Sequence, residues 1–238
     1  MTLLALENVS KTYYRGGRHR LPILRDVSLH VDAGELVAIV ADPTAGKTTL
    51  LRIAAGLEPP DTGTVSLAGQ PLPATNDLDP RIALVTRTPP PRETTSLPVS
   101  DFVALALMDR MPTREARQRT DAVLDAFDLC TLASSTWHEL SDVERTLIRI
   151  AQAVVRRPTL LLLDDPVLGL GISHMETVLS QIRDAARTHA TAALMTAAHP
   201  SEAMHADTML TLNAGALVGT SRYPARGQLL DFPTGRVS

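Results

Sequence analysis

Hydrophobic residues form short unbroken runs along this chain, separated by stretches of mixed polarity. The runs at 36–40, 82–85 and 160–163 contain only aliphatic residues, and a fourth apolar run covers 192–195. Runs of this length and composition predict strands that are buried on both faces, as in a parallel sheet. Because helical patterns separate the later runs, we expect an α/β protein with a mostly parallel sheet.

The beginning of the chain has a different pattern. Apolar side chains are clustered or alternate with polar ones, as is typical of strands, at residues 3–6, 9–14 and 23–31. A further short strand is expected at 64–67. Together these segments predict an antiparallel β subdomain at the N-terminus. A basic segment at 15–20 separates two of the strands. It is typical of a solvated hairpin, and contact with lipid headgroups or a membrane partner is the alternative.

Helical periodicity dominates the middle of the chain, after three consecutive prolines that cannot continue a helix or a central strand. We expect a helical insertion subdomain from about 89 to 157, and one more helix after it. The expected helices cover residues 101–108, 114–127, 143–155 and 173 to about 186. Ser141 and Ser173 each precede a glutamate by three positions, which is the Ser-x-x-Glu pattern of a capping box.

Length and composition exclude several classes of protein. With 238 residues, of which 44% are hydrophobic and 21% charged, the chain can form one or two domains with a real core. No apolar run is long enough to span a bilayer, and no signal sequence is expected. Cys130 stands alone, which excludes an internal disulfide and fits a reducing cytosol. The net charge of −3 argues against a nucleic-acid partner.

A loop joins the strand at 36–40 to a helix that starts near Lys47. In such a loop, backbone N–H groups and the positive end of the helix favour an anion. Lys47 would neutralise the outer phosphates of a nucleotide, and Thr48 would offer its hydroxyl to Mg²⁺. The strict pattern asks for glycine five residues before Gly46, where Ala41 stands. The expected nucleotide-binding residues here are Ala41, Asp42, Pro43, Thr44, Ala45, Gly46, Lys47, Thr48 and Thr49.

The three residues Gly-Lys-Thr recur by chance, and alone they usually mark a polar helix start. The buried strand before them and the amphipathic helix after them favour nucleotide binding over that alternative. Gly56 stands where this helix would need a left-handed residue at its C-terminal end.

Further candidates for chemistry follow two later strands. Asp164 and Asp165 come directly after the run at 160–163, at the end of a parallel strand where ligands bind. One carboxylate can hold Mg²⁺ through water, and the other can orient an attacking water. His199 follows the run at 192–195 and could reach a γ-phosphate, although such a histidine alone is more often a surface or core residue.

With these motifs in this order, the chain resembles the ATP-binding subunits of ABC transporters along nearly its whole length. The family's positions are occupied by Tyr13 (adenine stacking), 41–48 (P-loop), Arg87 (Q-loop), 140–144 (signature), 160–165 (Walker B), Gly171 (D-loop) and His199 (switch histidine). The segments at 15–20 and 97–103 look most like the lipoprotein-release and macrolide-export branch. The resemblance implies a P-loop NTPase core, one ATP-binding domain over 1–220, and a C-terminal tail over 221–238.

In this family, two chains stack head to tail, and each ATP lies between one chain's P-loop and the other's signature. The resemblance therefore implies that Ser141 contacts the ATP of a partner, in a homodimer or a heterodimer. It also implies a transmembrane permease as partner and a cytoplasmic location, peripheral on the inner face of the cell membrane. Mg²⁺ would lie with ATP, between Thr48 and Asp164.

Three departures from the family affect the chain's own site. Thr44 replaces a glycine, which would cost about 1 to 3 kcal/mol if its φ were positive. Arg87 replaces a glutamine expected near Mg²⁺, and a fixed cation repels the metal. Asp165 replaces the usual glutamate base and is one methylene shorter, which can slow hydrolysis about 100-fold.

Three more departures affect the site that the chain would complete on its partner. Asp142 places a carboxylate near the partner's phosphates, and like charges at about 4 Å repel by roughly 4 kcal/mol at an effective dielectric constant of 20. Val143 adds bulk where the family has glycine, and Gly171 replaces the D-loop aspartate. Two functions therefore remain open. The first is a transport ATPase with slow hydrolysis, and the second is a pseudo-ATPase that acts as a structural or regulatory partner. A soluble kinase explains neither the helical insertion nor the late strand with its histidine.

Overall fold

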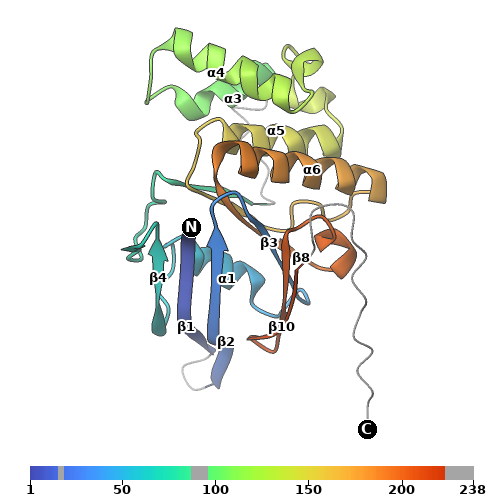
Figure 1. Cartoon of the computed structure of the whole chain (residues 1–238). Helices are drawn as coiled ribbons and strands as arrows, with labels where there is room; N and C mark the ends of the chain where they lie inside the picture. The colour runs from blue at the N-terminus through green and yellow to red at the C-terminus, as the bar shows by residue number, and fades with distance from the viewer. Residues whose placement is uncertain (16–18, 87–95, 223–238) are drawn as a thin grey trace.

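The computed structural model describes residues 1–15, 19–86 and 96–222, and it contains two sheets and a group of helices (Figure 1). The larger sheet has six strands in the order β10-β9-β3-β8-β7-β6. Its strands are β3 (Leu36–Val40), β6 (Ile82–Val85), β7 (Leu160–Leu163), β8 (Ala192–Ala197), β9 (Thr208–Asn213) and β10 (Ala216–Arg222). All neighbouring pairs are parallel except β9 with β10. The predicted mostly parallel sheet is confirmed.

The smaller sheet is antiparallel and has four strands in the order β2-β1-β4-β5. They are β1 (Thr2–Arg15), β2 (His19–Asp32), β4 (Thr62–Leu67) and β5 (Gln70–Pro71). This confirms the predicted N-terminal β subdomain. The strands expected at 3–6 and 9–14 form one long strand, in which shifts of register take up the irregular spacing. The tip of the predicted basic hairpin, residues 16–18, lies outside the described residues.

Helix α1 (Lys47–Ala54) lies between the two sheets. Its Leu50 shares one apolar core with Leu6 of β1 and Ile39 of β3. After the helix, Gly56 has a φ of +67°, which confirms the expected left-handed end. Because α1 packs against both sheets, the loop that precedes it is anchored at the edge of the larger sheet.

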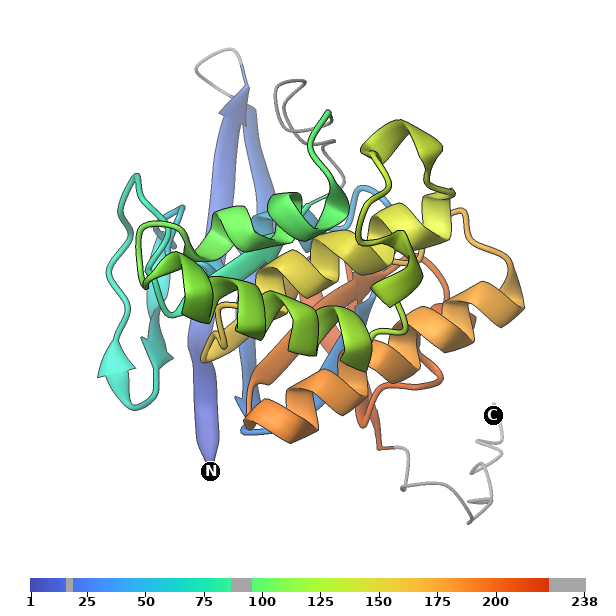
Figure 2. The same ribbon diagram turned by 90° about the horizontal axis from the view of Figure 1, so that it is seen from above.

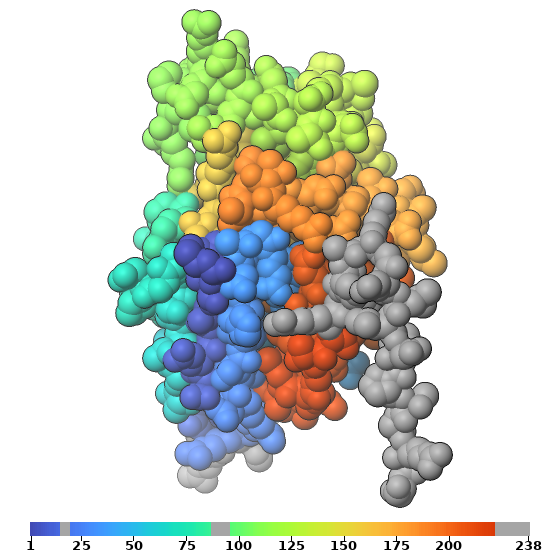
Figure 3. Space-filling view, in the orientation of Figure 1, coloured from blue at the N-terminus to red at the C-terminus, as the bar shows by residue number. Residues whose placement is uncertain are grey.

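The remaining helices cover the other face of the larger sheet. They are α3 (Val99–Ala104), α4 (Thr113–Ala126), α5 (Asp142–Val154) and α6 (Ile172–His189). Short 3₁₀ turns are η1 (Leu105–Leu107), η2 (Cys130–Leu132), η3 (Trp137–Glu139) and η4 (Pro200–Ala203). Helices α3 and α4 form an outer layer over α5 and α6 (Figure 2). In the space-filling view this layer (green) rests directly on α6 (orange) (Figure 3).

Two predicted helix starts have different outcomes. Ser141 caps α5, and the capping box with Glu144 is confirmed. The second box is wrong, because Gly171 is the N-cap of α6 and Ser173 already lies in its first turn. The first predicted helix of the insertion also begins earlier than expected, at Val99, and tightens to 3₁₀ geometry at Leu105.

The extents assigned to the domain, its insertion and its tail stay predictions. The proline run at 89–91 and residues 223–238 of the predicted tail lie outside the described residues, whereas residues 221 and 222 end β10. Among the described helices, none has the length and hydrophobicity that crossing a bilayer requires.

Candidate functional site

The loop 41–46 joins β3 to α1 at the carboxyl edge of the larger sheet. Gly46 is the N-cap of α1 with a φ of +99°, and a Cβ atom there would lie 2.8 Å from Cγ2 of Ile23. This position therefore requires glycine, both for its backbone angle and for the close approach of β2. The first N–H groups of a helix have no partner within the helix, so the end of α1 is suited to an anion.

Lys47 is enclosed by this loop and by the neighbouring strands, with an exposed fraction of 3%. Its Nζ donates to the carbonyl oxygens of Ala41 at 2.9 Å and Ala197 at 3.3 Å. The same ammonium lies 3.4 Å from Oδ1 of Asp165. The sequence placed this carboxylate 118 positions downstream of the lysine, and the fold makes the two an ion pair.

The two carboxylates after β7 lie against both the P-loop helix and β8. Thr48 Oγ1 donates to Asp164 Oδ2 at 3.3 Å, so the two residues predicted to hold a metal are adjacent. Thr196 Oγ1 lies 3.1 Å from Asp164 Oδ1 and 3.0 Å from Asp165 Oδ1, and it accepts the N–H of Asp165 at 2.8 Å. The structure thus brings Lys47, Thr48, Asp164 and Asp165 into one cluster, with Thr196 beneath it.

The donor set of this cluster fits Mg²⁺ bound together with a nucleotide. A hydroxyl and a carboxylate are hard oxygen ligands, and Mg²⁺ normally takes its other ligands from water and phosphates. Among the described residues, no group of three or more His, Cys, Asp and Glu side chains could hold a metal ion by itself. Thr48 and Asp164 would therefore need phosphate oxygens to complete the site.

Tyr13 lies beside α1 at the far end of the candidate site. Its hydroxyl donates to Glu58 Oε1 at 2.6 Å and lies 3.4 Å from Thr49 Oγ1, while the side chain stays 38% exposed. Burial and then the hydrogen bond to Glu58 raise the pKa of Tyr13. Lys11 lies 5.8 Å from the centre of the ring. An anchored but accessible aromatic ring suits stacking on a purine.

His199 follows β8 and is the N-cap of η4. Its carbonyl oxygen accepts the backbone N–H of Glu202 at 3.0 Å, and the Glu202 carboxylate accepts the N–H of His199 in return. The residue is exposed, and in the described part of the chain no hydrogen bond or ion pair joins it to Lys47 or Asp165. The catalytic roles predicted for His199 and Asp165 stay predictions.

Ser141 lies away from this cluster, at the start of α5. Its Oγ donates to Glu144 Oε2 at 2.7 Å, and its N–H donates to the same oxygen at 2.7 Å. Within the described residues, no hydrogen bond or ion pair joins Ser141 to the P-loop of its own chain. Its predicted contact with a partner's ATP remains a prediction. Arg87, predicted at the Q-loop, lies outside the described residues.

The loop residues themselves differ in exposure. Ala41 is buried, Asp42, Pro43 and Thr44 are exposed, and Ala45 is intermediate. The strain considered for Thr44 does not arise, because Thr44 is not among the described residues with positive φ. The left-handed turn falls on Gly46 instead. Asp165 has a positive φ of 46°, which no feature of the sequence predicted.

A cavity of about 150 Å³ opens beside the carboxylates, lined by Val85, Thr86, Thr146, Arg149, Asp164, Asp165, Pro166 and Leu168. Arg149 of α5 donates to the carbonyl oxygen of Thr86, and burial lowers the pKa of its guanidinium. Neither Arg149 nor Thr196 was predicted from the sequence. For Thr196 a signal exists, since it is the one polar residue of the otherwise apolar β8.

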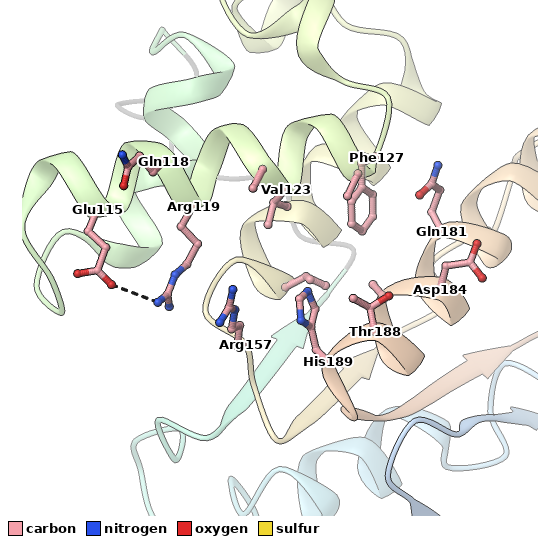
Figure 4. Close-up of a pocket in the computed structure, with 14 residues that line it drawn as sticks. Glu115, Gln118, Arg119, Val123, Phe127, Arg157, Gln181, Asp184, Thr188 and His189 are labelled. Atoms are coloured by element: carbon pink, nitrogen blue, oxygen red, sulfur yellow. Dashed lines mark hydrogen bonds and ion pairs between the residues drawn. The ribbon is translucent and has the colours of Figure 1, made fainter.

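A larger cavity of about 500 Å³ lies elsewhere, between α4, the end of α5, and α6 (Figure 4). Arg157 and His189 lie side by side at its edge. Burial and then the charge of Arg157 lower the pKa of His189. None of the residues predicted to bind a nucleotide lines this cavity.

Comparisons with known proteins agree with this geometry. A family model described as ABC transporter matches residues 24–168. The lipoprotein-releasing system ATP-binding protein LolD of Maricaulis maris is 33% identical over 226 residues, which cover 90% of this chain and 96% of LolD. The spermidine/putrescine import ATP-binding protein PotA of Marinobacter nauticus is 32% identical over 194 residues, which cover 76% of this chain and 47% of PotA. The chain thus spans about half the length of PotA and nearly all of LolD.

Solved structures share the fold. The ATP-binding cassette MJ0796, in a dimeric post-hydrolysis state with ADP and Pi, superposes with a TM-score of 0.77 at 24% identity, covering 92% of this chain and 98% of MJ0796. The protein cbiO1 from Clostridium perfringens superposes with a TM-score of 0.82 at 20% identity, covering 93% of this chain and 88% of cbiO1. The arrangement of the two sheets and the helical layer is therefore that of known ATP-binding cassettes.

Proposed function

This chain belongs to the ABC transporter family of ATP-binding proteins, and from that premise we propose that it is the ATP-binding subunit of a membrane transporter complex. ATP would close a dimer of two such subunits, and a separate permease would carry the substrate. The observation that supports this most directly is the convergence of Lys47, Thr48, Asp164 and Asp165 at the start of α1. Two separate segments of the chain build that cluster, and Thr196 of a third segment, β8, contacts both carboxylates.

Each residue of the site has a definable task in nucleotide binding. Lys47 and the free N–H groups of α1 neutralise and hold the phosphates, and the exposed ring of Tyr13 stacks on the adenine. Thr48 and Asp164 would hold Mg²⁺, which would supply charge neutralisation at the phosphates when bound. Asp165 accepts a proton from the attacking water, and His199 hydrogen-bonds the γ-phosphate.

We propose that hydrolysis is weak, and the position of Asp165 supports this. Its carboxylate turns inward toward Lys47 and Thr196, and only 14% of the side chain is exposed. An aspartate in this conformation must leave both contacts before it can activate a water. A misplacement of about 1 Å can cost about 100-fold in rate.

The start of α5 supports the same proposal for the second site of the dimer. Ser141 would contribute its hydroxyl and the helix N-terminus to the partner's γ-phosphate. Asp142 follows it with a side chain that is 87% exposed and lies 3.2 Å from Arg145. Its negative charge opposes a bound phosphate, and the bulk of Val143 adds to the obstruction.

A pseudo-ATPase is the second candidate, in which the chain binds ATP or nothing and supports an intact subunit or a permease. Four departures from the family favour this candidate, namely Arg87, Asp142, Val143 and Gly171. The partner in either case is a permease together with a second ATP-binding chain, identical or different, on the inner face of the membrane. The full-length match to LolD supports the lipoprotein-release branch.

ATP turnover by the purified chain separates the two candidates. The ATPase predicts slow, magnesium-dependent turnover that both Lys47→Ala and Asp165→Ala abolish. It also predicts that Asp165→Glu raises turnover, because the longer side chain can reach past the Lys47 contact. Absence of turnover in the natural chain and in Asp165→Glu, with ATP binding retained, would establish the pseudo-ATPase instead.

A further inference from the structure

Thr196 occupies an unusual place for a hydroxyl group. It lies on β8, between β3 and β7, and its exposed fraction is 0%. The other five residues of the strand are apolar. A buried hydroxyl is stable only with hydrogen-bond partners, so its partners indicate what it does.

The hydroxyl of Thr196 joins both carboxylates of the candidate site. It accepts the backbone N–H of Asp165 at 2.8 Å, and it lies 3.0 Å from Asp165 Oδ1 and 3.1 Å from Asp164 Oδ1. A hydroxyl has one proton, so it donates to one carboxylate at a time. The double contact with Asp165, through its N–H and its side chain, holds that residue in one conformation.

In this conformation Asp165 contacts the amine that should bind phosphate. Its Oδ1 lies 3.4 Å from Lys47 Nζ, and the backbone of Asp165 is left-handed with a φ of 46°. An ammonium group has three N–H donors. Those of Lys47 face three acceptors of the protein itself, which are Asp165 and the carbonyl oxygens of Ala41 and Ala197.

We propose that Thr196 is a positioning residue that holds Asp165 on Lys47, so that the chain's own carboxylate competes with the phosphates of ATP for the P-loop lysine. The identity of the competing ligand rests on the proposed function, whereas the contact of Thr196, Asp165 and Lys47 is a property of the protein alone. A side chain without a hydroxyl at position 196 releases Asp165 toward solvent. The lysine then becomes more available.

The first test needs no nucleotide and uses the fact that the chain has only two lysines, Lys11 and Lys47. An amine-specific acetylating reagent is added at limiting amount, and peptide mass spectrometry compares the modification of Lys47 with that of Lys11. Thr196→Val keeps the shape and should raise the relative reactivity of Lys47 several-fold. Thr196→Ser keeps the hydroxyl and should match the natural chain. If Thr196→Val does not fold, Thr196→Ala takes its place.

The second test measures the dissociation constant for ATP by calorimetry in the presence of EDTA, so that no metal contributes. Thr196→Val should bind ATP about 3- to 10-fold more tightly than the natural chain, the effect of one ordinary hydrogen bond. Thr196→Ser should not differ from the natural chain. In an Asp165→Asn background, Thr196→Val should change the affinity by less than about 2-fold, because no carboxylate remains to hold.

The two tests fail in different ways. Unchanged reactivity of Lys47 in Thr196→Val overturns the positioning role, whatever the protein binds. Raised reactivity with no ATP binding by any variant supports the positioning role and refutes the proposed nucleotide site. An equal gain in ATP affinity with and without Asp165→Asn overturns the role of the carboxylate.

Discussion

Removing the charge of Lys47 should destabilise the folded chain, apart from any effect on ligands. Lys47→Met keeps most of the side-chain volume but leaves Asp165 without its cation in a place where only 14% of the carboxylate side chain is exposed. At the observed 3.4 Å, two unit charges attract by about 5 kcal/mol at an effective dielectric constant of 20. Desolvation of both groups offsets most of this attraction in the intact pair, but Lys47→Met leaves the carboxylate desolvated without a partner. We therefore expect the free energy of unfolding to fall by about 3 to 5 kcal/mol.

Thermal and urea unfolding, followed by circular dichroism, measure this change. For a chain of this size, the expected loss lowers the melting temperature by about 9 to 15 °C. The double variant Lys47→Met with Asp165→Asn should recover about half of the loss or more, because no buried charge remains unpaired. Arg119→Met is a matched control, since it removes an exposed i,i+4 pair with Glu115 and should change stability by less than about 0.5 kcal/mol. A Lys47→Met variant as stable as the natural chain, or a double variant less stable than either single one, would show that the pair of Lys47 and Asp165 does not stabilise the fold.

Three further predictions concern other parts of the site. Gly46→Ala should lower the free energy of unfolding by about 1 to 3 kcal/mol, because its Cβ would lie 2.8 Å from Ile23 at a φ of +99°; an unchanged melting temperature would contradict this. Ser141→Ala should cost about 1 kcal/mol in urea unfolding by removing the cap of α5, whereas Ser141→Asp should retain most of the stability. Glu58→Gln should lower the pKa of Tyr13 in an ultraviolet titration of the phenol, although burial, the larger cause, remains. An unshifted titration in the variant would exclude Glu58 as a cause. Because the pKa of Tyr13 is raised in the folded state, its contribution to stability is complete below the pKa of the unfolded state. This contribution is lost as pH rises through the pKa of the folded state.

The parts of the site that are continuous in sequence were predictable. The chain runs directly from strand β3 through the loop 41–46 into helix α1. The pattern of hydrophobic and turn residues in this one stretch is therefore enough to predict these elements. The same holds for β7 with Asp164 and Asp165. Parallel pairing then brings these strand ends to one edge of the sheet, as expected.

The contacts between distant segments were not predictable from the sequence. Thr196 meets Asp165 across 31 positions, and Lys47 meets Ala197 across 150. Periodicity predicts that strands exist, but it does not predict which side chains meet below their ends. The inward conformation of Asp165 depends on these contacts, and it is the feature that bears most on hydrolysis.

One local prediction failed and one condition was not met, each for a physical reason. The Ser-x-x-Glu pattern at Ser173 is present, but Gly171 is extended and starts α6 two residues earlier, so the serine has no free helix end to cap. Thr44 carries no left-handed strain, because Gly46 makes the turn of the loop. In both cases a neighbouring glycine takes the special position, and the pattern alone did not show which residue would do so.

Whether this chain binds ATP through Lys47 can be measured by calorimetric titration of Mg-ATP into the natural chain, Lys47→Met and Arg119→Met, each below its melting temperature. We expect the natural chain and Arg119→Met to bind one nucleotide per chain with equal affinity. Lys47→Met should bind at least about 10-fold more weakly, because it lacks the cation that faces the phosphates. Equal affinity of Lys47→Met and the natural chain, or no binding by the natural chain, would contradict this expectation.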